Sequence, residues 1–166
     1  MASKRDWLDE GLKLLAEQGA PAVTIERLTE RLGLSKGSFY HHFKGMPGFR
    51  TALLTHHEAE HTTRFIEMAE QASDDKLRAL LELVYTPGHG PELEIAMRAW
   101  ALQDAEAREV QARVDRTRTG YLAELCGDTE LARALYLVFV GAGQVVPPLK
   151  PAELRQALEF TLGRNR

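Results

Sequence analysis

The residues with the clearest chemical potential lie in one short segment, which reads SKGSFYHHFK from Ser35 to Lys44. At helical spacing its apolar side buries Phe39 and Phe43. The opposite side holds cations, hydrogen-bonding rings and a glycine, but no acid: Lys36, Gly37, Tyr40, His41 and Lys44. Such groups can donate to guanine, bond phosphate oxygens or contact a thymine methyl. The types alone also suit a solvated helix face, so the order of the neighbouring residues has to decide.

Three short predicted helices position this segment. The first contains apolar residues at helical spacing from Trp7 to Leu15, after the possible N-cap Ser3. Thr24 is expected to cap a second helix, and its hydroxyl, with the N–H groups of the first turn, can hold a phosphate. Gly33 ends that helix in a tight turn, and Ser35 caps the third. Three helices within 45 residues predict a helix-turn-helix unit.

The order of residues in this region is more specific than their types. Residues 19–49 read GAPAVTIERLTERLGLSKGSFYHHFKGMPGF, and this segment resembles the N-terminal domain of TetR-family transcriptional regulators. The resemblance implies a helix-turn-helix motif at about 25–44 and a third helix that contacts DNA. The predicted DNA-binding residues are Thr24, Ser35, Lys36, Gly37, Tyr40, His41, His42 and Lys44.

Two residues depart from the family pattern. Thr29 stands where such proteins usually have alanine, so the packing between the helices is expected to differ slightly. Met46 stands where the family usually has a phosphate-binding lysine. DNA affinity should therefore be weaker unless Lys44 or Arg50 compensates.

The rest of the chain also has helical periodicity, and we predict an all-α fold. We expect a DNA-binding domain at 1–46 and a helical ligand-binding and dimerisation domain at 47–166. The resemblance implies an effector cavity between the fourth and seventh helices. Its candidate lining residues are large and mostly apolar: Phe65, Met68, Tyr85, Met97, Trp100 and Tyr121. No charged group stands out beside them, which favours an apolar or aromatic effector.

TetR-family proteins usually form homodimers through their last two long helices, here expected at about 129–146 and 151–163. Residues 135–146 are apolar nearly all round, and Gly141 and Gly143 would allow a second helix to approach closely. A helix buried within the monomer remains the alternative. A two-fold dimer would present two reading helices to a palindromic operator.

The net charge of −3 hides an asymmetry. Residues 1–50 carry eight Lys/Arg against six Asp/Glu, whereas the remainder carries thirteen against eighteen. A mildly basic head on an acidic body can bind DNA if its cations share one face. A single cysteine, with neither a signal peptide nor a membrane-spanning segment in the pattern, indicates the cytoplasm.

Two other classes of function stay open. His57 and His61 have the i,i+4 spacing of a metal site, but a third ligand is not evident, and we expect neither a metal nor a cofactor. A small all-helical metal-dependent enzyme is one alternative, although no catalytic residues can be assigned and we expect no enzyme. An effector-free DNA-binding protein is the other.

Overall fold

The computed structural model describes residues 2–72, 74–85 and 91–163, and these ranges contain helices and turns but no strand. The prediction of an all-α fold is confirmed. The α-helices are α1 (Lys4–Gln18), α2 (Ile25–Leu32), α3 (Lys36–His42), α4 (Met46–Glu58), α5 (Arg64–Glu70), α6 (Lys76–Tyr85), α7 (Pro91–Gln103), α8 (Ala105–Cys126), α9 (Thr129–Gln144) and α10 (Pro151–Gly163). Within the described ranges, no helix is both long and apolar enough to cross a membrane.

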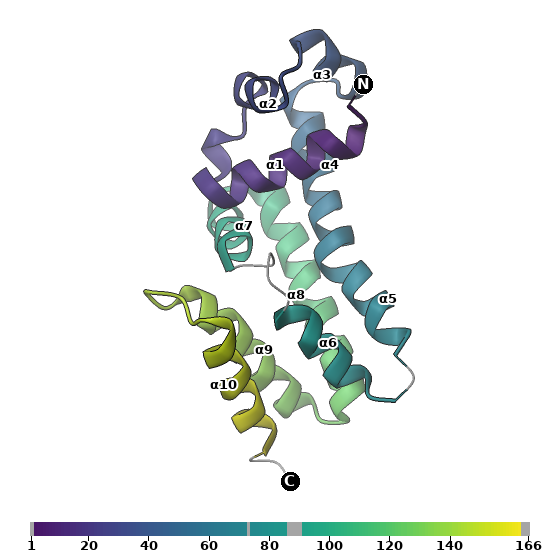
Figure 1. Cartoon of the computed structure of the whole chain (residues 1–166), viewed down its shortest axis with the longest axis vertical. Helices are drawn as coiled ribbons and strands as arrows, with labels where there is room; N and C mark the ends of the chain where they lie inside the picture. The colour runs from purple at the N-terminus through teal and green to yellow at the C-terminus, as the bar shows by residue number, and fades with distance from the viewer. Residues whose placement is uncertain (1, 73, 86–90, 164–166) are drawn as a thin grey trace.

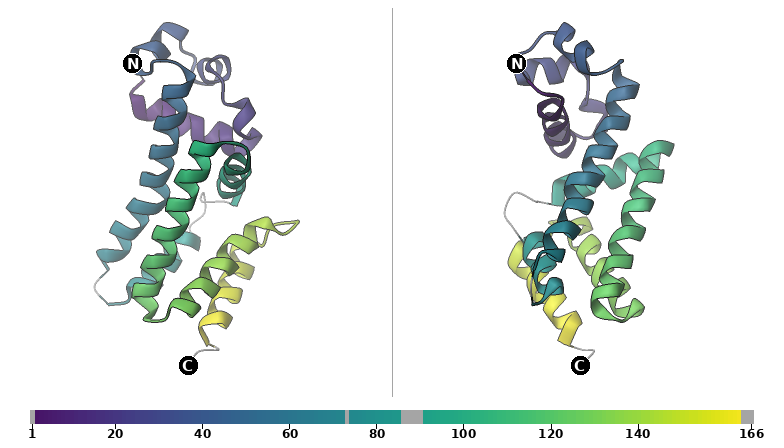
Figure 2. Two further views of the ribbon diagram at one scale, coloured as in Figure 1. Left: turned by 180° about the vertical axis from the view of Figure 1, so that it is seen from behind. Right: turned by 90° about the vertical axis from the view of Figure 1, so that its right-hand side faces the viewer.

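The molecule is elongated, with α1–α3 forming a head at one end (Figure 1). Helix α3 lies at the outer tip of the head, and α4 leads from there into the body. Figure 2 shows α8 running beside the α4–α5 rod, while α9 and α10 lie together at the opposite end from the head. The helix predicted to meet DNA and the helices predicted to meet a partner are therefore well separated.

Local capping explains where the helices of the head begin. The Ser3 hydroxyl accepts from the Asp6 N–H, and the Asp6 carboxylate accepts from the Ser3 N–H, which completes a capping box. Thr24 and Ser35 cap α2 and α3 with their side chains, as the sequence predicts. Gly33 ends α2 with φ 66°, a left-handed conformation that glycine adopts without a Cβ penalty.

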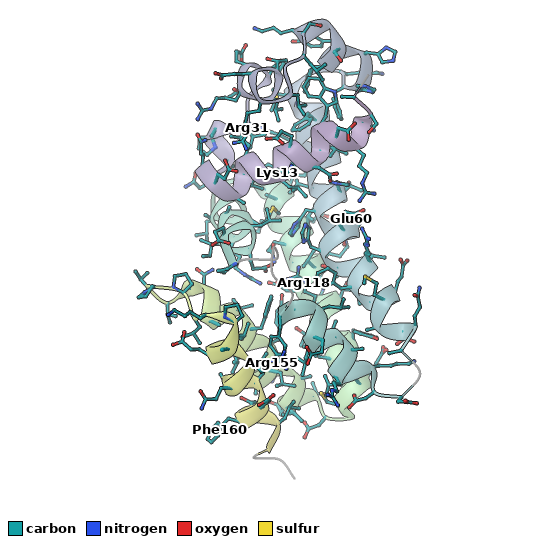
Figure 3. All side chains as sticks on the ribbon, in the orientation of Figure 1. Lys13, Arg31, Glu60, Arg118, Arg155 and Phe160 are labelled. Atoms are coloured by element: carbon teal, nitrogen blue, oxygen red, sulfur yellow. The ribbon has the colours of Figure 1, made fainter. Side chains whose placement is uncertain are left out.

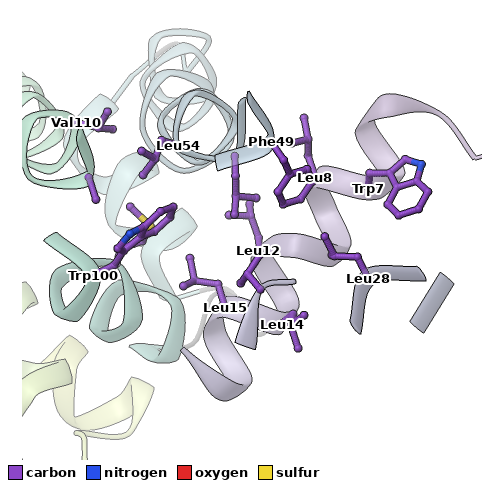
Figure 4. Packing of buried hydrophobic residues seen from close by; sticks show 14 of the residues in the cluster. Trp7, Leu8, Leu12, Leu14, Leu15, Leu28, Phe49, Leu54, Trp100 and Val110 are labelled. Carbon is purple, nitrogen blue, oxygen red and sulfur yellow. The ribbon is translucent and has the colours of Figure 1, made fainter. Parts of the chain in front are cut away.

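One apolar cluster fills the head and continues into the body (Figure 4). Trp7 and Phe39 are fully buried, with ring centroids 5.5 Å apart in an edge-to-face arrangement. From there the cluster passes through α1 and α4 to Met97 and Trp100 of α7 and to Val110 of α8. The head is therefore fixed to the body by continuous packing rather than by a linker.

A π-helical segment, Ala59–Thr63, joins α4 to α5. The helical periodicity of the sequence does not predict this π turn, which interrupts the helix between α4 and α5. Such turns insert one extra residue into a helix and often occur at functional sites. The segment contains no proline or glycine that would mark the turn in the sequence. It is held instead by a tertiary contact, since Arg118 of α8 donates to the His61 carbonyl and to the Thr62 hydroxyl.

Gly11 is needed for the closest helix contact in the head. A Cβ at this position would lie 2.8 Å from Cζ of Phe49 and 3.0 Å from Cδ1 of Leu53. We predict that Gly11→Ala lowers the free energy of unfolding by about 1–3 kcal/mol through overpacking. The matched control is Gly120→Ala in α8, where a Cβ meets nothing within 4 Å. It should be neutral or stabilising by up to about 1 kcal/mol. Urea unfolding measures both, and equal effects would contradict the assignment.

Candidate nucleic-acid interface and internal cavity

Helix α3 is held by its apolar side against the head. Phe39 packs edge-to-face on Trp7, and the Phe39 ring also lies 5.2 Å from Phe43 and 5.6 Å from Phe49, centroid to centroid. All four rings are buried. This anchoring fixes the rotation of α3 about its axis, so the opposite side faces away from the protein.

Four of the five residues predicted for the outward face lie on α3, whereas Lys44 lies beyond the extended C-cap residue Phe43. The five residues Lys36, Gly37, Tyr40, His41 and Lys44 are all exposed. The Tyr40 ring contacts Phe39 edge-to-face, with centroids 5.5 Å apart, yet 58% of the Tyr40 surface remains accessible. Lys44 makes no ion pair with any described residue. The structure thus brings the predicted cations and rings together on one exposed face.

Three other predicted residues have structural roles in the described fold. Thr24 and Ser35 are occupied as N-caps, accepting from Arg27 N–H at 3.3 Å and Ser38 N–H at 3.3 Å. His42 is half-buried, with Nε2 3.1 Å from the Ala2 carbonyl oxygen. Their roles in DNA binding stay predictions, which the capping and burial make secondary to those of the exposed residues.

The head also places an acid beside the predicted surface. Lys36 Nζ lies 2.6 Å from Glu26 Oε1, and both side chains are largely exposed. The hydrogen bond to Glu26 raises the pKa of Lys36, and its counterpart lowers the pKa of Glu26. An exposed pair of this kind contributes little stability, so phosphate can compete for the lysine. Neither this contact nor the placement of Lys4 over the Phe43 ring was foreseen from the sequence.

The two departures from the family pattern are accommodated. The Thr29 hydroxyl donates to backbone carbonyls of its own helix, 2.8 Å from Ile25 O and 2.8 Å from Glu26 O. Met46 opens α4 and packs half-buried against the core cluster. The expected lysine position is therefore apolar, while Arg50 one turn later is exposed.

The body contains a partly open cavity of about 260 Å³ between α4, the π segment, and helices α5 to α10. Of the six residues predicted to line an effector site, Phe65, Tyr85 and Tyr121 line this cavity, and their contact with an effector stays a prediction. Met97 and Trp100 instead belong to the buried cluster that joins α7 to the head, and Met68 is an exposed residue of α5. Their size and apolar character led to the prediction, but the helices that pack around each residue determine whether its side chain faces the cavity.

The cavity also has charged and polar residues in its lining, which we did not predict. Glu94 and Arg118 form a buried ion pair with Arg118 Nη1 3.0 Å from Glu94 Oε2. Figure 3 shows Arg118 in the middle of the molecule, at the level of the α4–α5 rod. Burial acts to raise the pKa of Glu94, but Arg118 and Arg98 outweigh it and hold that pKa below its ordinary value.

His57 is the other polar residue in the lining, and only 1% of its surface is accessible. Neither ring nitrogen has a hydrogen-bond partner among the described residues. The His61 ring stacks on it with centroids 5.3 Å apart. Burial, with a contribution from His61, lowers the pKa of His57 to about 3, so the imidazole is neutral at pH 7. In the part of the chain described, no three His, Cys, Asp or Glu side chains gather as a metal site would require.

The comparisons with known proteins agree with this arrangement. Residues 8–53 match the family model described as bacterial regulatory proteins, tetR family. No curated protein sequence matches the chain significantly. The fold is similar to that of NemR from E. coli in its reduced form, with TM-score 0.79 and 20% identity over 95% of this chain and 94% of the other.

Two further structures are similar over nearly their whole length. A transcriptional regulator from Rhodococcus sp. Rha1 has TM-score 0.78 and 16% identity, covering 98% of this chain and 95% of that one. A transcriptional regulator from Saccharomonospora viridis in complex with choline has TM-score 0.74 and 20% identity, covering 98% and 96%.

The exposed face of α3, the two capped helices before it and the helical body define a helix-turn-helix transcriptional regulator. The family model matches residues 8–53, which include the helix-turn-helix, and the same fold extends over the whole chain, so the protein has a TetR-like fold with an N-terminal helix-turn-helix DNA-binding domain.

The burial of His57 generates a pH prediction. Its pKa is about 6.5 in the unfolded chain and about 3 in the folded one, so between these values the unfolded state binds the extra proton and stability falls as pH falls. Between pH 7.5 and 5.5 we expect the wild type to lose about 1.4 kcal/mol more than His57→Phe does. Denaturant unfolding at both pH values measures this. Parallel losses in the two proteins would contradict a buried, neutral His57.

Proposed function

We propose that the protein is a homodimeric transcriptional repressor that binds a palindromic operator through α3 and is released by a small effector in the body cavity. The observation that carries DNA binding is the exposed, acid-free face of α3, anchored from behind by buried Phe39. The effector role is supported by a mostly apolar cavity in the body, because a solidly packed body would favour an effector-free binder. The family is not an enzyme family. We expect the protein to act in the cytoplasm.

In the proposed complex, Lys36, Gly37, Tyr40 and His41 face the base edges or adjacent phosphates of the major groove. Lys44 comes directly after Phe43, the C-cap of α3, and we expect it to contact the phosphate backbone. Together with Arg50, it would supply the contact that Met46 cannot make. Binding should therefore weaken steeply as salt rises, since each phosphate contact releases counterions.

Selection of bound duplexes from a random library tests the proposal as a whole, because it reports binding, symmetry and half-site spacing together. We expect enrichment of a palindrome whose half-sites are about one helical turn or more apart. A library that returns no enriched sequence would contradict sequence-specific DNA binding.

For the proposed DNA-binding surface, we predict that Lys44→Ala weakens operator binding roughly tenfold. The magnitude of the slope of log K against log salt concentration should fall by about 2, one unit for each subunit. Tyr40→Ala should weaken binding by a similar factor and leave the salt slope nearly unchanged. The matched control is Lys76→Ala, which removes the same charge from α6 in the body. Fluorescence anisotropy measures all three; if Lys76→Ala acts like Lys44→Ala, the effect is one of net charge.

The dimer proposal rests on the outer faces of α9 and α10. Leu137 of α9 is 64% accessible, and Phe160 of α10 is 60% accessible and projects outward in Figure 3. Val145 and Val146 follow α9 and are also exposed. A Cβ at Gly141 would meet nothing within 4 Å, so a second helix can approach this point of α9 closely. Large apolar side chains exposed on one helix pair favour contact with a second copy.

We predict that Leu137→Lys shifts the protein from dimer to monomer by burying an unpaired charge at the interface. The matched control is Leu102→Lys at the end of α7, where the leucine is 80% accessible. Sedimentation velocity distinguishes the species. A Leu137→Lys protein that remains dimeric, or a Leu102→Lys protein that dissociates, would place the interface elsewhere.

A further inference from the structure

The charges that line the cavity are already satisfied by one another. Glu94 accepts from Arg118 with both carboxylate oxygens and from Arg98 Nη2 at 3.0 Å. Arg118 also donates through Nε to the Thr62 hydroxyl at 3.0 Å and through Nη2 to the His61 carbonyl at 3.1 Å. Behind them, Arg98 is paired with Asp115. The cavity wall is therefore electrically neutral overall, because its one carboxylate, Glu94, and its one guanidinium, Arg118, compensate each other.

The hydrogen-bonding capacity left in the wall belongs to neutral groups. Both ring nitrogens of His57 lack a partner among the described residues, and so does the Tyr85 hydroxyl. A neutral imidazole has one N–H donor and one acceptor nitrogen. Buried polar atoms are nearly always paired, and leaving one unpaired costs about 1–3 kcal/mol. Two unpaired groups in the wall of one cavity indicate that something else completes their bonds.

We propose that the cavity binds an uncharged molecule, apolar over most of its surface, whose hydroxyl, carbonyl or amide group hydrogen-bonds to the His57 imidazole. This inference rests on the proposed effector function and narrows it to a chemical class. The aromatic and aliphatic lining, including Phe65, Leu80 and Phe139, covers the apolar part of the molecule. The polar group pairs with the His57 imidazole, whose two unpaired ring nitrogens offer one donor and one acceptor.

Ionic ligands fit this wall poorly. A cation would have to draw Glu94 away from Arg118 and Arg98, and an anion would have to draw Arg118 away from Glu94 and the π segment. Breaking a buried pair leaves a charge uncompensated, which is strongly unfavourable. A neutral ligand leaves the Glu94–Arg118 pair intact. Its polar group gives up its hydrogen bonds to water on binding and gains a hydrogen bond to His57 in their place.

The test uses the full chain without DNA and four probes with one carbon skeleton: 2-naphthalenemethanol, 2-methylnaphthalene, 2-naphthoate and 2-naphthylmethylammonium. At pH 7.5, titration calorimetry should show the alcohol binding about tenfold more tightly than the hydrocarbon, because one buried hydrogen bond is added. Both ions should bind at least tenfold more weakly than the alcohol. An ion that binds as tightly as the alcohol, or no binding by any probe, overturns the proposal.

Variants locate the hydrogen bond. His57→Phe should bind the alcohol no more tightly than the hydrocarbon, a loss of about tenfold, with affinity for the hydrocarbon unchanged. The matched control is Tyr136→Phe, which removes a cavity hydroxyl that already donates to Asp115 at 2.7 Å. It should keep the preference for the alcohol. A preference that survives in His57→Phe, or disappears in Tyr136→Phe alone, overturns the assignment to His57.

A third variant tests the neutral wall. Glu94→Gln leaves Arg118 without its carboxylate, so the cavity becomes cationic, and 2-naphthoate should then bind at least tenfold more tightly than it does to the wild type. Unchanged affinity for 2-naphthoate overturns the argument from charge. Duplex selection with the wild type is independent of these titrations. An enriched palindrome without the ligand preference refutes the ligand class alone, and the reverse result refutes the operator alone.

Discussion

The orientation of the DNA-binding head depends on the buried cluster that crosses from the head into the body. In Figure 4, Trp7 lies at one end of this cluster and Trp100 and Val110 at the other, with Leu12 and Leu15 of α1 between them. Turning the head against α7 would expose these apolar side chains at about 25 cal/mol per Å². The head therefore follows the helices on which it is packed, and a change in its position has to begin in the body.

The α4–α5 rod provides the connection between cavity and head. Phe49 and Leu53 of α4 are fully buried in the head cluster, whereas His57, one turn further along, lines the cavity. Arg118 binds the π segment directly beyond it through the His61 carbonyl. A ligand that contacts His57 thus contacts the same helix that carries α3. It can shift the head only by binding one arrangement of this helix better than another.

Much of the head could be predicted from the sequence because its determinants are local. Caps lie within three residues of the N–H groups that they accept from, Gly33 ends its helix by its own φ, and Phe39 faces inward at helical spacing from Phe43. In the body the same rules predicted helices but not their neighbours. Trp100 and Tyr121 are both large and helical, yet one packs toward the head and the other lines the cavity.

The polar end of the cavity shows why the remainder was not predictable. Glu94 and Arg98 have the i,i+4 spacing that any helical pattern displays, and that spacing is typical of a solvated helix face. Glu94 is covered by Arg118, which lies 24 residues further along the chain. Arg118 reaches Glu94 only because α7 and α8 pack against each other in one register. For His57 the sequence showed only its i,i+4 spacing from His61, and not that the ring would be buried where α4 packs against α8. Apolar periodicity identifies which side of a helix is buried. It does not show which charges on the other side will be covered by a helix from elsewhere, and in this protein those charges decide what the cavity can hold.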